Sequence, residues 1–240
     1  MRCLFMEMIR NKTYTNYYQK SKMEMDLIHK QGIRPSIAMH VCCGPCSTWP
    51  IEFLNTTFKV TVIYDNPNIY PETEYQRRLE ELKRYVEEFN KNNNADVELI
   101  IFPYTHKEHM DRLKVYGKQK EGGERCQMCY TLRMEECYKY AEEKGFDYFC
   151  TVMSISRQKD SQILNQIGNI LEKKYKPKYF YSDFKKKGGD DRKRELIKLY
   201  HLYNQLYCGC EYSYAEFVEK VKAKALEEGK EPDFSGIKEE

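Results

Sequence analysis

Cysteines at short spacing are the residues in this sequence most able to do chemistry. Residues 40–46 read HVCCGPC, so Cys42, Cys43 and Cys46 lie within five residues of one another, directly after the apolar residues 37–39. Thiols this close together indicate metal binding or redox chemistry. A turn at the end of a strand lets several side chains converge, and we therefore expect the later cysteine pairs to meet at this turn.

The second pair is Cys126 and Cys129, in a segment whose pattern predicts a helix. At a spacing of three residues the two thiols lie on one helix face. Together with Cys42 and Cys43 they make four, the usual complement of an iron–sulfur cluster or of a structural zinc site. Adjacent cysteines are awkward in a zinc ribbon, and this favours the iron–sulfur centre.

The third pair is Cys208 and Cys210, separated by Gly209 alone. A disulfide between them would close a small, strained ring, and strained disulfides have oxidising potentials and cycle readily with the dithiol form. Metal ligation is the alternative. Because four other thiols already complete a centre, we expect Cys208 and Cys210 to form a redox-active pair.

One carboxyl group is a candidate for acid catalysis. Asp65 follows the β-branched run 58–64, so it would point from the end of a strand toward the cysteine turn, as an acid or as an extra ligand. Capping of the following turn is the alternative role. The other potential ligands are expected to be bystanders, namely the isolated thiols of Cys3, Cys137 and Cys150 and the surface-helix residues His106 and His109.

Residues 172–198 combine positive charge with aromatic side chains. The segment holds 11 Lys and Arg against 5 Asp and Glu, and its interleaved aromatic residues are Tyr175, Tyr179, Tyr181 and Phe184. Such a segment is typical of a phosphate-binding surface with platforms on which bases stack. An ordinary solvated loop and helix face is the alternative.

The composition of the whole chain is that of a globular protein in a reducing compartment. It has 240 residues, 10 cysteines and a formal charge of +3 from 40 basic and 37 acidic residues, which excludes a histone-like protein. The sequence contains no evident secretory signal or bilayer-spanning stretch. We therefore expect a cytoplasmic protein whose clustered cysteines are metal ligands or redox catalysts. ATP use is not indicated, because there is no Gly-rich phosphate loop.

Apolar runs and helical patterns alternate along the chain. We expect strands at 36–41, 58–64, 97–102, 146–153 and 178–181, and helices at 47–55, 71–91, 105–115, 125–144, 161–173, 191–206 and 214–228. This alternation predicts an α/β fold, a three-layer, mostly parallel sheet with a helical C-terminal part. We expect an N-terminal helical arm at 1–35, a single α/β catalytic domain at 36–228 and a polar tail at 229–240.

Several segments, taken in order, resemble one known family. They are HVCCGPCS (40–47), YDNPNIYPETEYQRRLEEL (64–82), RCQMCYTLRMEECYKYAEEKGFDYFCTVMSISRQKDSQILNQIG (125–168), SDFKKKGG (182–189) and YCGCEYS (207–213). From about Lys20 to Phe217 the chain is similar to the QueH family of epoxyqueuosine reductases. The resemblance implies the last step of queuosine biosynthesis, the two-electron removal of the epoxide oxygen from epoxyqueuosine at the wobble position of tRNA.

The resemblance also implies roles for the thiols. A [4Fe-4S] cluster would be held by Cys42, Cys43, Cys126 and Cys129. Cys208 and Cys210 would be the redox-active pair, and Cys46 is the candidate ligand of an adjacent mononuclear iron. The fold would be of the adenine-nucleotide α-hydrolase type, which is Rossmann-like, with cysteines where relatives have a phosphate loop.

Our hypothesis is therefore an iron–sulfur reductase that acts on tRNA. Its catalytic candidates are Cys208, Cys210, Cys46 and Asp65, with Asp65 or a tyrosine as the proton donor. The expected partners are the anticodon arm that carries epoxyqueuosine and an external electron donor of unknown identity, with no membrane involved. The alternative is a zinc-stabilised RNA-binding module without catalysis. A sulfur-transfer enzyme on the same fold would need ATP, and the missing phosphate loop argues against it.

Overall fold

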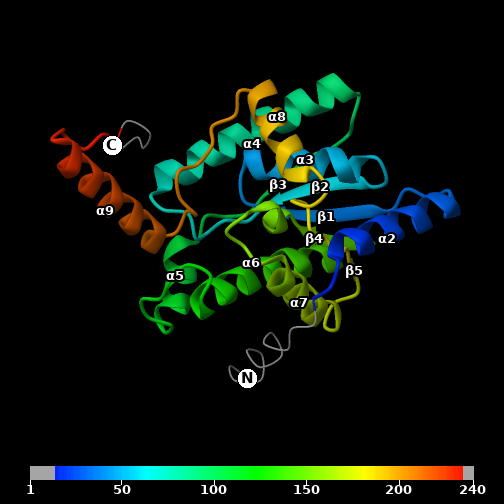
Figure 1. Cartoon of the computed structure of the whole chain (residues 1–240). Helices are drawn as coiled ribbons and strands as arrows, with labels where there is room; N and C mark the ends of the chain where they lie inside the picture. The colour runs from blue at the N-terminus through cyan, green and yellow to red at the C-terminus, as the bar shows by residue number, and fades with distance from the viewer. Residues whose placement is uncertain (1–13, 235–240) are drawn as a thin grey trace.

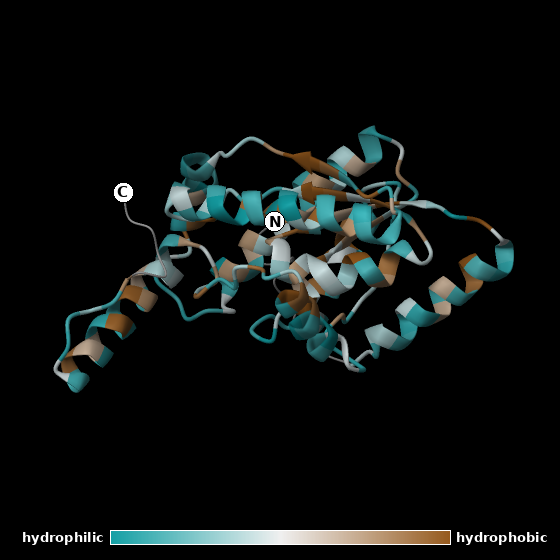
Figure 2. Ribbon diagram, turned by 90° about the horizontal axis from the view of Figure 1, so that it is seen from above, coloured by the Kyte–Doolittle hydropathy of each residue, from teal (hydrophilic) through white to brown (hydrophobic). Residues whose placement is uncertain are grey.

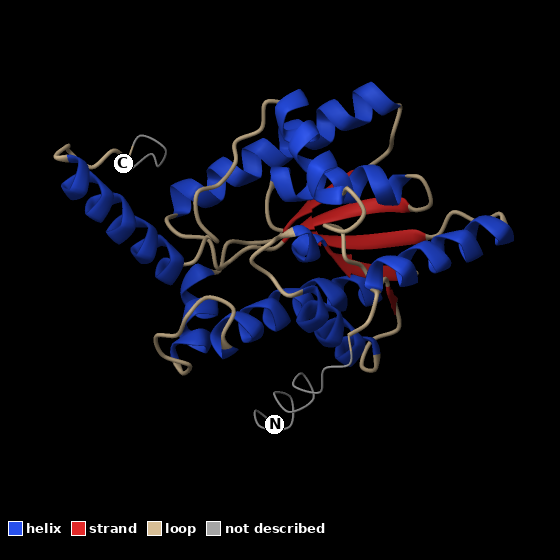
Figure 3. Cartoon of the chain, viewed as in Figure 1, coloured by secondary structure: helices blue, strands red, loops and turns tan. Residues whose placement is uncertain are grey.

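A parallel sheet forms the middle of the protein. The computed structural model describes residues 14–234, and in them the strands are β1 (Ser36–Val41), β2 (Lys59–Tyr64), β3 (Glu98–Ile101), β4 (Tyr148–Thr151) and β5 (Lys178–Tyr179). All neighbouring strands pair in parallel, in the order β3-β2-β1-β4-β5. Figure 3 shows this sheet between two layers of helices. The predicted three-layer α/β fold is confirmed, and the strand order is that of a Rossmann-like sheet.

Helices cover both faces of the sheet (Figure 1). One face carries α3 (Gly44–Asn55), α4 (Glu72–Asn93) and α8 (Gly189–Leu199), and α2 (Tyr17–Gln31) adds Met25 and Ile28 to the same core. The other face carries α6 (Glu124–Glu143) and α7 (Ser161–Glu172), which form a second core. Next to α6 lies α5 (His106–Lys114), and α9 (Glu211–Glu228) projects from the body at one end.

Local sequence accounts for these elements. The β2 residues KVTVIY are β-branched or aromatic at most positions and are buried on both faces, as expected for a central parallel strand. In α4 the buried residues recur at helical spacing, as predicted, and include Tyr75, Leu79, Leu82, Val86 and Phe89. Figure 2 shows the resulting contrast between hydrophobic strands and the more hydrophilic outer helices.

Several predicted elements are shorter than expected, and two of these changes lead the chain to one edge of the sheet. The strand expected at 146–153 ends at Thr151, where the Thr151 hydroxyl accepts a hydrogen bond from Met153 N and a 3-10 turn, η1 (Val152–Ile155), begins. The helix expected at 191–206 ends at Leu199, because His201 adopts a left-handed backbone conformation. Residues 200–210 are consequently an irregular segment that leads to α9.

The predicted N-terminal arm and C-terminal tail both extend past the described residues. The arm expected at 1–35 contains α2, whereas residues 1–13, with Cys3, lie outside the part of the chain that the structure describes. Residues 235–240 of the expected tail also lie outside it. The domain boundaries therefore stay predictions. Within residues 14–234, the structure has no helix that is both long enough and apolar enough to cross a membrane.

Candidate metal and redox site

The carboxyl ends of β1 and β4 define the place where the thiols gather. From β1 the chain proceeds to β2 and β3 on one side, whereas β4 and β5 lie on the other side. In parallel sheets a ligand-binding crevice forms where the strand order reverses in this way. A cavity of about 250 Å³ lies there, and Cys42 and Cys46 from the turn after β1 line it together with Lys159 and Cys208. The turn is thus at the predicted edge of the sheet.

The thiols of Cys42, Cys43 and Cys46 form one group. Their three sulfur atoms all lie within 4.8 Å of one another, and the Cys42 and Cys43 sulfurs are 3.8 Å apart. Cys43 is the residue just before α3 and Cys46 is the third residue of the helix. Side chains at these two positions meet over the first turn of a helix, as in a capping box. The local helix start therefore brings Cys46, left over in the four-thiol assignment, to Cys42 and Cys43.

This group favours one negative charge over three. Burial raises the pKa of the Cys43 thiol well above its usual range. Hydrogen bonds from Cys42 and Cys43 hold the pKa of the Cys46 thiol well below its usual range, against the opposing effect of burial. The side-chain amide of Gln205 also donates to Cys46, at 3.8 Å. The trio therefore suits a soft cation that would compensate further thiolate charge.

Cys126 and Cys129 lie at the start of α6 and share a cavity with the Cys-Gly-Cys segment. They line a small cavity of about 20 Å³ together with Cys208 and Cys210. Burial raises the pKa of Cys129 to about 12. Cys208 lines both this cavity and the larger one, so it connects the two groups of thiols. All of these thiols are free. The assignment of four cluster ligands and of a redox-active pair stays a prediction.

Two cations accompany the thiols. Arg133 is 3% exposed and follows Cys129 by one helical turn, and its Nη1 donates to Asn66 Oδ1 at 3.1 Å. Its positive charge interacts with the Cys129 and Cys208 thiols, and no ion pair joins it to a carboxylate within residues 14–234. Lys159, from the loop after η1, lines the larger cavity. Positive charge is thus available at the site for thiolates or for an anionic oxygen.

The donor set fits an iron–sulfur centre. Soft thiols come from three separate segments, and buried cations can balance their negative charge as thiolates. Two buried polar atoms along the small cavity, Asn68 Oδ1 and the Tyr130 hydroxyl, have no hydrogen-bond partner among the described residues. Buried polar atoms are rarely left unsatisfied. Among residues 14–234 the only group of three or more potential metal ligands within 4.8 Å of one another is Cys42, Cys43 and Cys46, whereas Cys126 and Cys129 line the separate small cavity, so the meeting of all four proposed cluster ligands stays a prediction.

Asp65 lies behind this site rather than in it. It is 6% exposed, lines neither cavity, and accepts a hydrogen bond from the Cys137 thiol at 4.0 Å. Its carbonyl lies 3.2 Å from His40 Nε2. Burial raises the pKa of Asp65 to about 7, against the lowering effect of Arg133. A role for Asp65 as the catalytic acid stays a prediction.

Replacing Asp65 with asparagine should change the pH dependence of stability. The folded protein holds the proton up to about pH 7, well above the usual Asp pKa of 3.8, so the wild type loses stability as pH rises between these values. We expect the free energy of unfolding of Asp65→Asn, relative to wild type, to rise by about 2–3 kcal/mol from pH 5 to pH 7.5. Urea unfolding under argon at the two pH values measures this difference. The same difference in unfolding free energy between Asp65→Asn and wild type at both pH values would contradict the raised pKa of Asp65.

The prediction that His106 and His109 are surface polar groups is wrong for His109. His109 is 6% exposed, and its Nε2 lies 3.5 Å from Cys129 Sγ. Burial lowers its pKa to about 3, so the ring is neutral. His106 is partly buried and lies 2.9 Å from Glu211. The packing of α5 against α6 decides this outcome, and a helical pattern alone did not show it.

The prediction of stacking platforms in residues 172–198 is also wrong for two of its aromatic residues. Tyr179 is 1% exposed and Phe184 is 3% exposed, because β5 and the loop after it pack into the two cores. Tyr181 stacks on Tyr17 of α2. Some of the basic residues are also engaged, since Arg192 forms ion pairs at 2.9 Å with Glu52 and Glu195.

Comparison with known proteins identifies the family. The profile described as "Epoxyqueuosine reductase QueH" matches residues 37–216. The chain belongs to the QueH family. The epoxyqueuosine reductase QueH of Streptococcus pyogenes is 38% identical over 198 residues, covering 82% of this chain and 78% of that protein. The QueH protein of Staphylococcus aureus is 38% identical over 200 residues, covering 82% and 83%.

Similarity to solved structures is weaker. The U34-tRNA thiolase NcsA from Methanococcus maripaludis, solved with its [4Fe-4S] cluster, is 14% identical to this chain. The superposed region covers 94% of this chain and 74% of the NcsA chain, with a TM-score of 0.46.

Three residues at the site of this QueH-family protein had no role assigned from the sequence. Arg133 could have been found, since it lies four residues after Cys129 and therefore on the same face of α6. Lys159 and Arg78 come from segments far from the cysteines in the sequence, and both line the larger cavity. Both lie in segments that carry the family resemblance, 64–82 and 125–168, but their residue types and spacing alone do not distinguish them from ordinary surface cations.

Proposed function

We propose that this member of the QueH family reduces epoxyqueuosine to queuosine at the wobble position of tRNA, the last step of queuosine biosynthesis. The observation that carries the proposal is the larger cavity, in which Cys208 of the Cys-Gly-Cys segment lies beside Cys42 and Cys46. One thiol of the proposed redox pair and two thiols of the cysteine trio thus line one cavity, which is large enough for a small ring system. The family to which the chain belongs supplies the substrate.

The proposed cofactor ligands are those implied by the family resemblance. Cys42, Cys43, Cys126 and Cys129 would hold a [4Fe-4S] cluster, and Cys46 is the proposed ligand of an adjacent mononuclear iron. Such a centre supplies electrons singly and a Lewis-acidic iron for an oxygen atom. The Cys46 sulfur lies within 4.8 Å of the Cys42 and Cys43 sulfurs, and this position supports Cys46 as the ligand of the mononuclear iron.

The redox step uses the dithiol of Cys208 and Cys210. Oxidation of this dithiol to a disulfide releases two electrons and two protons, and forms one S–S bond. The epoxide takes up both electrons and both protons, its two C–O bonds break, and the products are a carbon–carbon double bond and one water molecule. An external reductant of the thiol or dithiol class then restores the pair.

Lys159 can stabilise the epoxide oxygen as it leaves. Its ammonium group lines the larger cavity, and no carboxylate among the described residues forms an ion pair with it. A fixed positive charge beside a developing alkoxide lowers the barrier to breaking the C–O bond. The remaining candidate proton sources are the Tyr130 hydroxyl, which lines the small cavity, and Asp65, which lies behind the site.

The loop after β5 is the proposed contact for the tRNA backbone. Lys186 is exposed, forms no ion pair within residues 14–234, and lines a hollow that shares Gln158 and Lys159 with the larger cavity. We expect Lys186→Glu to weaken tRNA binding about ten-fold at low salt, since one phosphate contact becomes repulsive. Filter binding over a salt series measures this loss.

Lys91→Glu is the matched control for this prediction. Lys91 is equally exposed and lies at the C-terminal end of α4, toward the opposite edge of the sheet. Equal weakening in both variants would show a general charge effect and would remove the loop from the interface.

The enzymatic proposal is tested directly with tRNA. The iron-loaded protein is incubated anaerobically with epoxyqueuosine-containing tRNA and a strong reductant, and the nucleosides are identified by mass spectrometry. Conversion of epoxyqueuosine to queuosine is the expected result. Unchanged epoxyqueuosine in the presence of a full complement of iron would overturn the proposal.

A further inference from the structure

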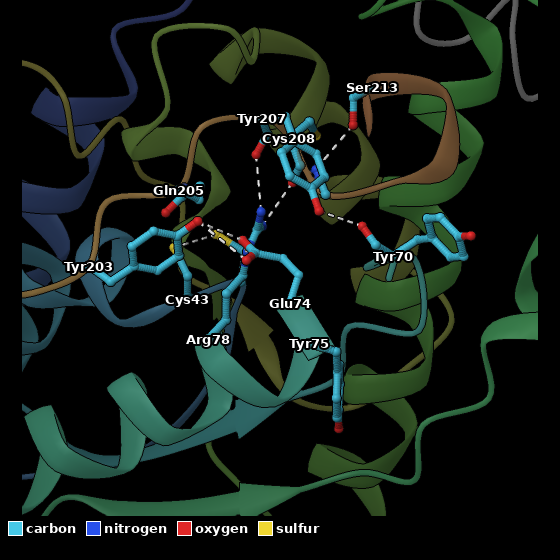
Figure 4. Close-up of polar contacts among 12 residues, drawn as sticks. Cys43, Tyr70, Glu74, Tyr75, Arg78, Tyr203, Gln205, Tyr207, Cys208 and Ser213 are labelled. Atoms are coloured by element: carbon cyan, nitrogen blue, oxygen red, sulfur yellow. Dashed lines mark hydrogen bonds and ion pairs between the residues drawn. The ribbon is translucent and has the colours of Figure 1, made fainter. Parts of the chain in front are cut away.

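A buried ion pair on α4 supports the segment that carries Cys208. Figure 4 shows Arg78 and Glu74 pointing from α4 toward this segment. Both side chains are 2% exposed, and Arg78 Nε donates to Glu74 Oε1 at 2.7 Å. The other two nitrogens of the guanidinium donate to main-chain oxygens, Nη1 to Cys208 O and Nη2 to Tyr207 O, both at 3.1 Å. One rigid, planar group therefore binds α4 to two consecutive carbonyls of the Cys-Gly-Cys segment.

The backbone around Gly209 is bonded on both sides. Tyr70 N donates to Gly209 O at 2.7 Å, and Gly209 N donates to the Ser213 hydroxyl oxygen at 3.1 Å. Gly209 has a φ of 130°, and a Cβ placed there would lie 3.0 Å from Arg78 Nη1. The segment is thus seated directly on the guanidinium, and its main chain has little freedom to shift.

Arg78 is also next to both Cys208 and the cysteine trio of Cys42, Cys43 and Cys46. It lines the larger cavity beside Cys42, Cys46 and Cys208, and its positive charge interacts with the Cys43 thiol. Cys43 comes from the turn after β1, whereas Cys208 is 165 residues further along the chain. No other described side chain in this cavity both bonds the Cys208 main chain and interacts with the cysteine trio.

We propose that Arg78 is a positioning residue of the reductive step, holding the carbonyls of Tyr207 and Cys208 so that the Cys208 thiol stays at the cavity beside Cys42 and Cys46. This inference rests on the proposed function. The placement of Cys208 by Arg78 can nevertheless be tested without enzymatic turnover. Arg78 acts through the main chain and need not touch the substrate. Its effect is therefore on the rate of the chemical step and not on tRNA binding.

Arg78→Lys is the decisive variant, and Arg84→Lys is its matched control. Lysine keeps the charge, but a single ammonium cannot reproduce the fork that reaches two carbonyls and Glu74 at once. Arg84 lies on the same helix, pairs with Glu81 and Glu88, and donates to the carbonyls of Tyr200 and His201 at 2.9 and 3.2 Å. It has the same guanidinium chemistry and holds the same segment of chain, but its side chain is 38% exposed where that of Arg78 is 2% exposed, and it lines neither cavity.

Two readouts are taken from anaerobic, iron-loaded protein. The first is the rate at which iodoacetamide alkylates Cys208, which peptide mass spectrometry monitors. We expect Arg78→Lys to raise this rate several-fold, because the released segment becomes more accessible. The second is queuosine formation, where we expect a kcat about 10- to 100-fold lower with an unchanged KM for tRNA, as for a misplaced reacting group. Arg84→Lys should match wild type in both readouts.

The proposal fails if Arg78→Lys leaves both readouts at wild-type values, or if Arg84→Lys alters them as much. Glu74→Gln provides a second, milder test, since it keeps Arg78 but weakens its anchor, and it should shift the alkylation rate in the same direction. Failure of the proposed function is distinguishable, because wild type would then form no queuosine whereas the alkylation comparison would still report on Arg78.

Discussion

Replacing Cys208 with serine is expected to lower the rate of queuosine formation by about 10³-fold or more, since the variant has lost half of the proposed dithiol. Serine is close in size to cysteine but cannot form a disulfide. Because Cys208 is not among the proposed cluster ligands, the iron content should stay at the wild-type value. Single-turnover assays with iron-loaded protein, together with iron analysis of the same samples, measure both quantities.

Cys150→Ala is the control for this prediction. Cys150 lies in β4, is fully buried and lines neither cavity, so its loss removes a thiol without touching the site. We expect this variant to retain near-normal turnover. Loss of iron in Cys208→Ser would instead make Cys208 a metal ligand, and the redox assignment of the pair would then be wrong. Full activity in Cys208→Ser would contradict it equally.

Cys126→Ser is expected to lose most of the visible absorption and iron of the anaerobically reconstituted protein. Cys126 lies in the first turn of α6, where it shares a cavity with Cys129, and it is a proposed ligand of the cluster. Because thiolate is the ligand that iron–sulfur clusters require, a hydroxyl at this position should leave the cluster incomplete and labile. Iron and acid-labile sulfide per chain, with the visible spectrum, measure the loss.

Cys137→Ala tests whether any change in α6 has the same effect. Cys137 lies on the same helix, is fully buried, and contacts Asp65 rather than the cavities. We expect its iron content to equal that of wild type. A colourless wild-type protein with stoichiometric zinc would contradict the cluster and would favour the zinc-stabilised RNA-binding module.

The architecture could be predicted because its causes are local. The run 58–64 is β-branched and apolar, so it forms a strand in almost any context, and the apolar spacing of α4 permits only a helix with one buried face. The errors lie at element ends. The helix expected at 191–206 ends at Leu199, and the strand expected at 146–153 ends at Thr151. The first end coincides with the left-handed backbone of His201, beside carbonyls that Arg84 of α4 binds, and the second with the hydrogen bond from Met153 N to the Thr151 hydroxyl, and apolar spacing predicts neither feature.

The same distinction between local and long-range causes applies to the positions of the thiols. The sequence by itself determined that Cys126 and Cys129 share a helix face, because a spacing of three residues suffices for that conclusion. It could also have placed Cys46 with Cys43, through the first turn of α3. In both cases the partners are close in the chain, and helix geometry alone sets where their side chains lie.

Only the tertiary structure decided that Cys208 lies between both thiol groups and that Arg78 holds it there. Cys208 and Arg78 are 130 residues apart, and their contact depends on how α4 and residues 200–210 pack at the carboxyl edge of the sheet. Other long-range contacts, of α5 with α6 and of β5 and the following loop with the two cores, bury His109, Tyr179 and Phe184, whose sequence positions suggested exposed roles. Residue types and spacing therefore identified the chemistry, whereas long-range packing determined which groups can act together.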